Sequence, residues 1–274
     1  MTEKSGWDIY LEYVPVLNVW YKAIATYAYQ LAIFVVIMIL FWWISSNYFF
    51  GALFYQIILS FLAILPFAYV TKNSEKLRKI YREKYGKLAY QKLEYKYLLY
   101  VVPLGSASLY LPALLKTNYY FFNGLIALPS NLITREIFPF FIEIPLAIAL
   151  IIIGALIRRP SGGFDIDIDS YIYLMFPEKS RKIEGGIYNF IRHPRYLGRF
   201  FIVIGLGVFG NNLLAISVAV VNFLSYFLLI RVEDGELVKR FGDSFKQHQR
   251  ETPALIPKYG KWGKFVRFVF IGEK

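Results

Sequence analysis

Long apolar blocks alternate with polar, charged stretches along this chain. Six segments are apolar enough for membrane helices: 27–46, 49–71, 98–115, 137–157, 196–209 and 212–231. A helix needs about 20 apolar residues to cross the hydrocarbon core of a bilayer. The fifth segment is short and is separated from the sixth by Gly210-Asn211-Asn212, which predicts a helical hairpin. The pattern predicts an all-α, polytopic integral membrane bundle with about six transmembrane helices.

The composition agrees with a membrane protein and narrows its chemistry. Of the 274 residues, 57% are hydrophobic, whereas soluble domains usually contain about 45–50% apolar residues. The chain has no cysteine, which excludes disulfides, thiolate metal sites and cysteine nucleophiles. No metal site is predicted.

The basic residues are unevenly distributed between the apolar segments. Segment 72–97 holds nine Lys and Arg, segment 158–195 holds seven, and segment 231–274 holds ten. With six spans these three segments lie on one side of the membrane. The positive-inside rule then places both termini and the polar end of the last hairpin in the cytosol. We interpret the net charge of +12 as a topology signal with attraction to anionic headgroups, and expect no nucleic-acid partner.

Segment 73–97 alternates in charge, and its Leu, Ile and Tyr recur at helical spacing. This pattern predicts an amphipathic helix lying in the membrane interface. A solvated connector is the alternative interpretation.

Three glycines in the fifth segment, Gly205, Gly207 and Gly210, match the dinucleotide-binding string G-x-G-x-x-G. That fingerprint functions only between a strand and a helix. Inside a membrane segment, small residues instead permit close contact between helices, and we expect that role here.

Four carboxylates lie next to apolar residues in the sequence. Asp165, Asp167 and Asp169 alternate with apolar residues, and three carboxylates can hold a hard cation. Because the glycine and the terminal glutamate of a calcium loop are missing, an exposed strand-like or looped segment is favoured. Glu143 lies inside the fourth span, where carboxylates are costly and often functional, so it is a minor candidate.

The stretch IRHPRYLGRF, residues 191–200, concentrates polar side chains at the start of the fifth span. His193 precedes Pro194 and is therefore biased away from helical angles, while proline suits the first helical position. We predict that a helix begins at Pro194 with His193 as its cap, so that its free N–H groups form an anion site. Further cations and rings are supplied by Arg192, Arg195, Arg199, Tyr188 and Tyr196. An ordinary membrane boundary rich in Arg and Tyr is the alternative.

The sixth span carries a polar stripe. Asn222, Tyr226, Glu233 and Arg240 fall within about 40° of one another on a helix, and such a stripe faces protein or a wet cavity rather than lipid. The hairpin then brings Glu233 and Asp234 back beside the His193 turn. The sequence predicts one site with anion-binding and cation-binding groups, suited to a ligand that carries a carboxylate and fixed positive charges.

Three sequence blocks resemble the isoprenylcysteine carboxyl methyltransferase and phospholipid methyltransferase superfamily. Residues 186–198 are similar to its signature G-P-Y-x-x-[VI]-R-H-P-x-Y-x-G. Residues 231–242 and 250–257 resemble its E-E-x-x-L-x-x-x-F-G and R-x-x-P-x-x-I-P blocks. The chain departs from the family pattern at Ile187, Asp234, Phe245 and His248, which leaves the substrate open. Residues 136–274 therefore read as a methyltransferase-like catalytic region, and residues 1–135 carry no assigned motif.

The resemblance implies an S-adenosylmethionine-dependent methyltransferase acting on a lipid-like or prenylated acceptor, with isoprenylcysteine carboxyl O-methylation favoured. It implies a cofactor site made of Tyr188, Arg192, His193, Pro194, Tyr196, Gly198, Glu233 and Asp234. Arg231 and Arg250 are the candidates for orienting a carboxylate acceptor, and Glu233 is the third catalytic candidate. An amine acceptor would need a base, for which Glu233 or His248 could serve.

Three other functions remain open from the sequence. One is a phospholipid N-methyltransferase of the phosphatidylethanolamine type. Another is a nicotinamide-dependent membrane reductase of the sterol or steroid type, because those enzymes share a related carboxyl-terminal architecture. The last is a transporter or scaffold without enzymatic activity.

Overall fold

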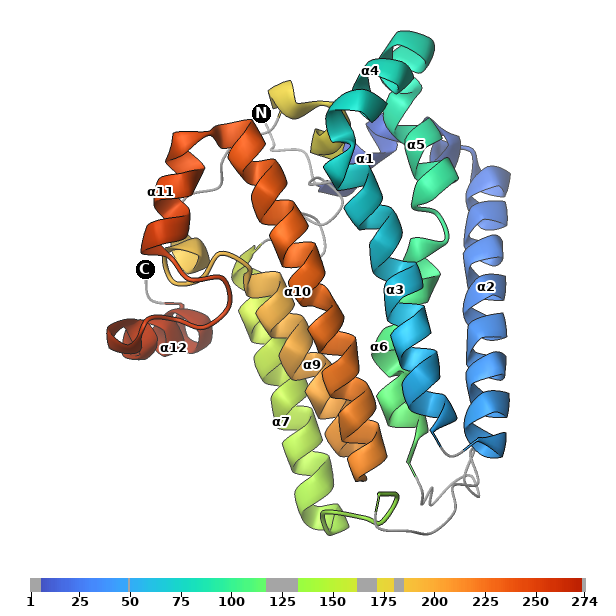
Figure 1. Ribbon diagram of the computed structural model, residues 1–274, viewed down its shortest axis with the longest axis vertical. Helices are drawn as coiled ribbons and strands as arrows, with labels where there is room; N and C mark the ends of the chain where they lie inside the picture. The colour runs from blue at the N-terminus through green and yellow to red at the C-terminus, as the bar shows by residue number, and fades with distance from the viewer. Residues whose placement is uncertain (1–5, 49, 117–132, 162–171, 180–184, 273–274) are drawn as a thin grey trace.

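The computed structural model describes residues 6–48, 50–116, 133–161, 172–179 and 185–272, and in these ranges every regular element is helical (Figure 1). The longer helices are α2 (Trp20–Asn47), α3 (Gly51–Lys72), α6 (Val101–Leu114), α7 (Phe140–Arg158), α9 (Pro194–Gly210) and α10 (Leu213–Phe241). The shorter ones are α1 (Gly6–Tyr13), α4 (Ser74–Tyr85), α5 (Ala89–Tyr97), α11 (Asp243–Glu251) and α12 (Trp262–Ile271). The predicted all-α polytopic bundle is confirmed.

All six predicted segments contain a helix, but the helices differ in whether they are long enough to cross a membrane. Within the described ranges, four helices (α2, α3, α7 and α10) are long and apolar enough to cross a membrane alone. A fifth span results if α4–α5 and α6 are counted together, with a bend of 47° between them. With 17 residues, α9 is shorter than a full span and forms one arm of the hairpin with α10, as the sequence predicted.

The turns between helices gather at two opposite ends of the bundle. The turn between α2 and α3, the start of α7 and the turn between α9 and α10 lie at the lower end in Figure 1. The break between α3 and α4, together with the end of α10 and all of α11, lies at the upper end. This arrangement agrees with the alternation of spans expected from the basic segments. Which end faces the cytosol stays a prediction.

The sequence predicted one amphipathic helix in segment 73–97, but the structure has two helices there. Helices α4 and α5 are joined by a short 3₁₀ turn that starts at Gly86, whose φ of +53° is a left-handed conformation that glycine adopts at little cost. Leu77, Tyr90 and Leu93 from this pair are buried in a cluster with Val14. The amphipathic face of the segment therefore packs on protein.

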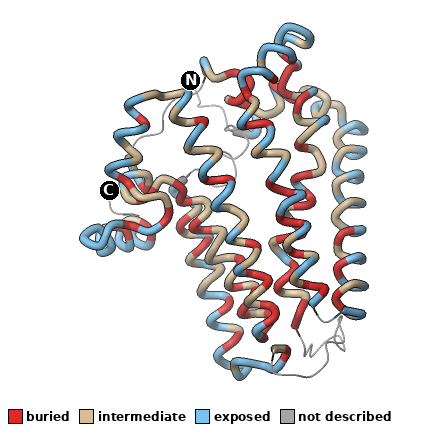
Figure 2. Tube along the Cα trace, viewed as in Figure 1, coloured by how far each residue is buried: buried red, intermediate tan, exposed pale blue. Residues whose placement is uncertain are grey.

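Close helix packing in the carboxyl-terminal half depends on small residues. A Cβ added to Gly205 would lie 2.9 Å from the carbonyl oxygen of Ala147 in α7, and one added to Gly207 would lie 2.9 Å from the Cβ of Ala219 in α10. The glycine string is therefore a packing motif, as predicted. In Figure 2 buried residues follow the inward faces of these helices, while α2 is largely exposed along its outer face. The Asp165–Asp169 stretch lies outside the described residues.

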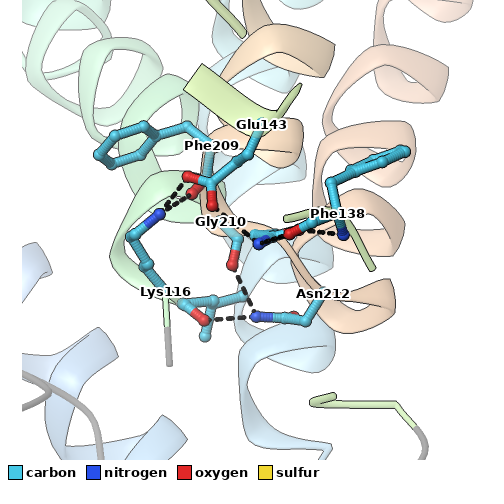
Figure 3. Close-up of polar contacts among 8 residues, drawn as sticks. Lys116, Phe138, Glu143, Phe209, Gly210 and Asn212 are labelled. Carbon is cyan, nitrogen blue, oxygen red and sulfur yellow. Dashed lines mark hydrogen bonds and ion pairs between the residues drawn. The ribbon is translucent and has the colours of Figure 1, made fainter. Parts of the chain in front are cut away.

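A buried polar cluster joins the ends of four helices, α6, α7, α9 and α10, at the lower end of the bundle (Figure 3). Lys116, just after α6, forms an ion pair with Glu143 of α7, and the two side chains are 9% and 3% exposed. The other oxygen of Glu143 accepts a hydrogen bond of 2.7 Å from Asn211, which ends α9 with a φ of +57°. Asn212 caps α10 by accepting from the N–H of Ala215 at 2.8 Å. Glu143 therefore serves the structure of the hairpin end.

Lys116→Met is expected to destabilise the protein by about 3–5 kcal/mol, because it leaves the buried Glu143 carboxylate without its cation. The double variant Lys116→Met/Glu143→Gln removes both charges and should be clearly more stable than the single variant. Denaturant unfolding in detergent micelles measures both effects. Lys92→Met, at an exposed lysine of α5, is the matched control. Equal stability of Lys116→Met and this control would contradict the assignment.

Candidate active site

Helix α9 begins where the sequence predicted. Pro194 is its first residue, and His193 is the N-cap with a φ of −122° and a ψ of 62°. The carbonyl oxygen of His193 accepts from the N–H groups of Tyr196 and Leu197, each at 3.2 Å. Because the backbone of His193 is not helical, its side chain leaves the path of α9 and faces α10, where the residue is 7% exposed.

The acidic pair of α10 meets this turn. Asp234 Oδ1 lies 2.9 Å from His193 Nε2, and Asp234 Oδ2 lies 2.8 Å from Arg192 Nη2. Glu233 Oε2 lies 3.7 Å from His193 Nδ1, and Glu233 Oε1 accepts a hydrogen bond from the Tyr196 hydroxyl. The predicted meeting of the two motif blocks is confirmed.

The basic and acidic groups of this cluster neutralise one another in part. Arg192 and Asp234 form a mostly buried pair, with side chains 12% and 14% exposed, so the charge of each is already met in part by the other. Glu233 is 24% exposed. Of the two carboxylates, Glu233 is more exposed than Asp234, which is 14% exposed.

A carboxyl-terminal segment holds the cluster from the other side. The backbone N–H groups of Arg192 and His193 donate to the carbonyl oxygens of Pro253 and Ala254, both at 2.9 Å. The Arg192 side chain donates to the carbonyl oxygens of Gln249, at 3.2 Å, and of Thr252. The third motif block thus contributes mainly backbone acceptors that fix the arginine.

Two of the predicted cofactor residues, Tyr188 and Gly198, have packing contacts in the structure. Tyr188 is in a short 3₁₀ turn, Gly186–Asn189, and is half-buried against the apolar cluster that contains Ile191 and Phe265. Gly198 lies against α7, where an added Cβ would be 2.5 Å from Cγ of Arg158. The structure thus gives Gly198 a packing contact, and its role toward a cofactor stays a prediction.

The residues predicted to orient the acceptor form no ion pair with the carboxylates of the cluster. Arg231 and Arg250 are exposed, and neither has an ion pair with another described residue. His248 is half-buried, and its ring lies 6.0 Å from that of Phe245. The i, i+3 and i, i+4 periods place Arg231 on a different face of α10 from Tyr226 and Glu233.

Two residues of α6 accept hydrogen bonds from side chains of α9 and α10. Arg199 Nη2 donates to the carbonyl oxygen of Gly105 at 2.8 Å, and its guanidinium lies 4.7 Å from the ring centroid of Tyr226. Asn222 Nδ2 donates to the backbone and hydroxyl oxygens of Ser108 at 3.1 and 3.0 Å. The stripe on α10 therefore faces protein, as predicted. The sequence offered no signal for the α6 partners, because Gly105 and Ser108 lie in an ordinary apolar segment.

The cluster offers complementary groups to a zwitterionic ligand with an added positive charge. Arg192 Nε is buried and has no hydrogen-bond partner among the described residues, so one donor is left for a carboxylate. Glu233 provides a negative charge for an ammonium group. The rings of Tyr196 and Tyr226, with centroids 5.4 Å apart, add faces that attract cations.

Comparison with known proteins identifies the family of this region. Residues 142–244 match the phospholipid methyltransferase family. This range contains the His193 turn and the acidic pair, so the resemblance to membrane methyltransferases predicted from the sequence blocks is confirmed for this part of the chain. No solved structure matches the chain.

Three curated relatives match parts of the chain. The chain is 33% identical over 76 residues to a protein-S-isoprenylcysteine O-methyltransferase of Schizosaccharomyces pombe, covering 27% of this chain and 32% of that protein. It is 31% identical over 88 residues to the cobalt-zinc-cadmium resistance protein CzcN of Cupriavidus metallidurans, covering 32% and 40%. It is 29% identical over 103 residues to a methanethiol S-methyltransferase of Crocosphaera subtropica, covering 36% and 39%. The chain thus spans about a third to two fifths of the length of these relatives.

Asp234→Asn is expected to lower the free energy of unfolding by about 1.5–3 kcal/mol, because hydrogen bonds to charged groups in partly buried sites contribute that much. The change removes the ion pair with Arg192 while keeping the size of the side chain. Thermal unfolding in detergent measures the loss. Asp243→Asn is the matched control, since Asp243 is 96% exposed and should lose little. Similar stabilities of the two variants would contradict a structural role of the Arg192–Asp234 pair.

Proposed function

We propose that this protein is an integral-membrane methyltransferase that uses S-adenosylmethionine and acts on a lipid-like acceptor. The observation that carries the proposal is the contact of Arg192 and His193 with Asp234, which joins two motif blocks into one charged cluster. The family match over residues 142–244 and the similarity to two methyltransferases support the reaction class.

The residues of the cluster fit the donor that this family resemblance implies. S-adenosylmethionine, when bound, supplies a methyl group on a positively charged sulfur, and its overall charge is +1. Arg192 would hold the α-carboxylate through its unused Nε, and Glu233 with Asp234 would hold the ammonium or the ribose hydroxyls. His193 and Pro194 fix the start of α9, while Tyr188 and Tyr196 would flank the adenine or the cation.

The favoured acceptor is the carboxyl group of an isoprenylcysteine or a related lipid-like acid. A carboxylate is ionised at neutral pH, so the protein needs no general base and has mainly to align the reacting atoms and exclude water. A phospholipid amine is the alternative, and the description of the matched family favours it. An amine would require proton removal, for which Glu233 is the nearest carboxylate.

The proposed placement follows from the charge distribution. The protein is a multi-pass membrane protein, and we place both termini and the cluster in the cytosol because the basic segments gather on that side. The polar donor would enter from the cytosol, and the acceptor would enter sideways from the bilayer. Residues 136–274 form the catalytic region in this proposal, and residues 1–135 form the membrane region that supports it.

Purified protein in lipid nanodiscs is expected to transfer a labelled methyl group from S-adenosylmethionine to an S-prenylcysteine analogue, with the product identified by mass. Phosphatidylethanolamine vesicles test the alternative acceptor in the same assay. Melting in the presence of S-adenosylhomocysteine or a nicotinamide nucleotide separates a methyltransferase from a reductase. Stabilisation by the nucleotide alone would overturn the proposal, and stabilisation by neither would favour a transporter or scaffold.

Glu233→Gln is expected to weaken binding of S-adenosylhomocysteine about tenfold or more, because it removes the charge that would hold the ammonium. The glutamine can still accept the hydrogen bond from Tyr196, so the fold should persist. Isothermal titration in detergent measures the affinity, with Asp243→Asn as the control. Unchanged affinity in Glu233→Gln and in His193→Ala would show that the donor binds elsewhere.

A further inference from the structure

The half-buried cation Arg199 has no carboxylate partner among the residues that the structure describes. Arg199 lies three residues beyond Tyr196, about 4.5 Å deeper along α9. Its interactions within the described chain are the hydrogen bond to the Gly105 carbonyl oxygen and the contact with the ring of Tyr226, and its Nε is buried without a partner. Lys116, Arg192 and Arg240 are each paired with a carboxylate. Because charges inside a helical bundle are normally paired, Arg199 is placed to bind an anion that the described part of the chain does not supply.

Helix α6 fixes the direction of this arginine. The Gly105 carbonyl oxygen accepts from both Arg199 Nη2, at 2.8 Å, and Ser108 Oγ, at 2.9 Å. Ser108 in turn accepts from Asn222, whose side-chain oxygen is buried without a partner. Asn222 is 1% exposed. An unpaired donor and an unpaired acceptor thus lie on one network that joins α6, α9 and α10.

The network is linked to the charged cluster by aromatic contacts. Arg199 lies over Tyr226, whose ring is 5.4 Å from that of Tyr196, and Tyr196 is hydrogen-bonded to Glu233. Glu233 stands seven residues after Tyr226 on α10, about 10 Å closer to the end of the bundle where the donor is proposed to bind. Arg199 is therefore on the bilayer side of the tyrosine pair.

We propose that Arg199 binds the anionic head of the acceptor, a carboxylate attached to an apolar chain, and that α6 positions it through Gly105 and Ser108. This inference rests on the proposed methyltransferase function and assigns the acceptor's contact to Arg199 instead of Arg231 or Arg250. One carboxylate oxygen forms the new C–O bond, the S–C bond breaks, and its electron pair stays on sulfur. The ester and the thioether formed are both neutral, so the product loses its attraction to Arg199 and can leave.

Arg199→Gln is expected to raise the KM for a carboxylate acceptor tenfold or more while the affinity for S-adenosylhomocysteine stays unchanged. Arg199→Lys should restore part of the loss, because it restores the charge without the fork of the guanidinium. Ser108→Ala should give a smaller rise in KM, since it loosens the positioning only. Arg267→Gln removes a cation from the exposed side of α12 and is the matched control.

Direct binding separates this inference from the proposed function. An S-prenylcysteine carboxylate analogue and its carboxamide are titrated against wild-type protein and Arg199→Gln, without any methyl donor. Wild type should prefer the carboxylate, and the variant should not. Equal preference in both proteins overturns the inference even if methyl transfer occurs. Weakened binding of S-adenosylhomocysteine to Arg199→Gln would instead assign this arginine to the carboxylate of the donor. A lowered melting temperature with an unchanged KM would show that Arg199 has only a structural role.

Discussion

Pairing of charges that lie far apart in the sequence is the constraint on which this bundle depends. A charged side chain among membrane helices is costly unless a partner reaches it. Lys116 and Glu143 meet this requirement at one end of the bundle, and Arg192 with Asp234 meets it near the other. Each pair joins separate helices or segments. The hairpin of α9 and α10 is therefore fixed at both ends, and the carboxyl-terminal cluster of charges is a product of the same requirement.

The bundle also depends on small residues, which let the helix backbones approach one another closely. Hydrophobic burial does little to hold helices together in lipid, so shape and polar contacts take its place. Gly154 and Gly198 face each other across α7 and α9, where an added Cβ on Gly154 would lie 2.5 Å from the carbonyl oxygen of Gly198. This contact brings the first turn of α9 against α7. It leaves the opposite face of α9 for α6 and α10, where Tyr196 and Arg199 lie.

The amino-terminal helices take part in the site although they carry no motif. Helix α6 provides the carbonyl oxygen of Gly105 and the hydroxyl of Ser108 to side chains of α9 and α10. Ser74, at the start of α4, donates to the buried Glu236 at 2.9 Å, in the same helix as Glu233. A division of the chain at residue 135 is thus a boundary of sequence motifs, across which the polar contacts of the site continue.

Periodicity and local rules determined the helices, the start of α9 at Pro194 and the common face of Asn222, Tyr226 and Glu233, because each depends on neighbours within a few turns of the chain. The motif blocks likewise pointed to one charged site. Only the tertiary structure showed that Arg192 is paired with Asp234, that Arg231 and Arg250 are exposed, and that segment 73–97 folds into two helices. Those features depend on which helices pack together. The partner of Arg199 could not be predicted either, because it is a backbone carbonyl oxygen of α6, and every residue has such a group whatever its side chain.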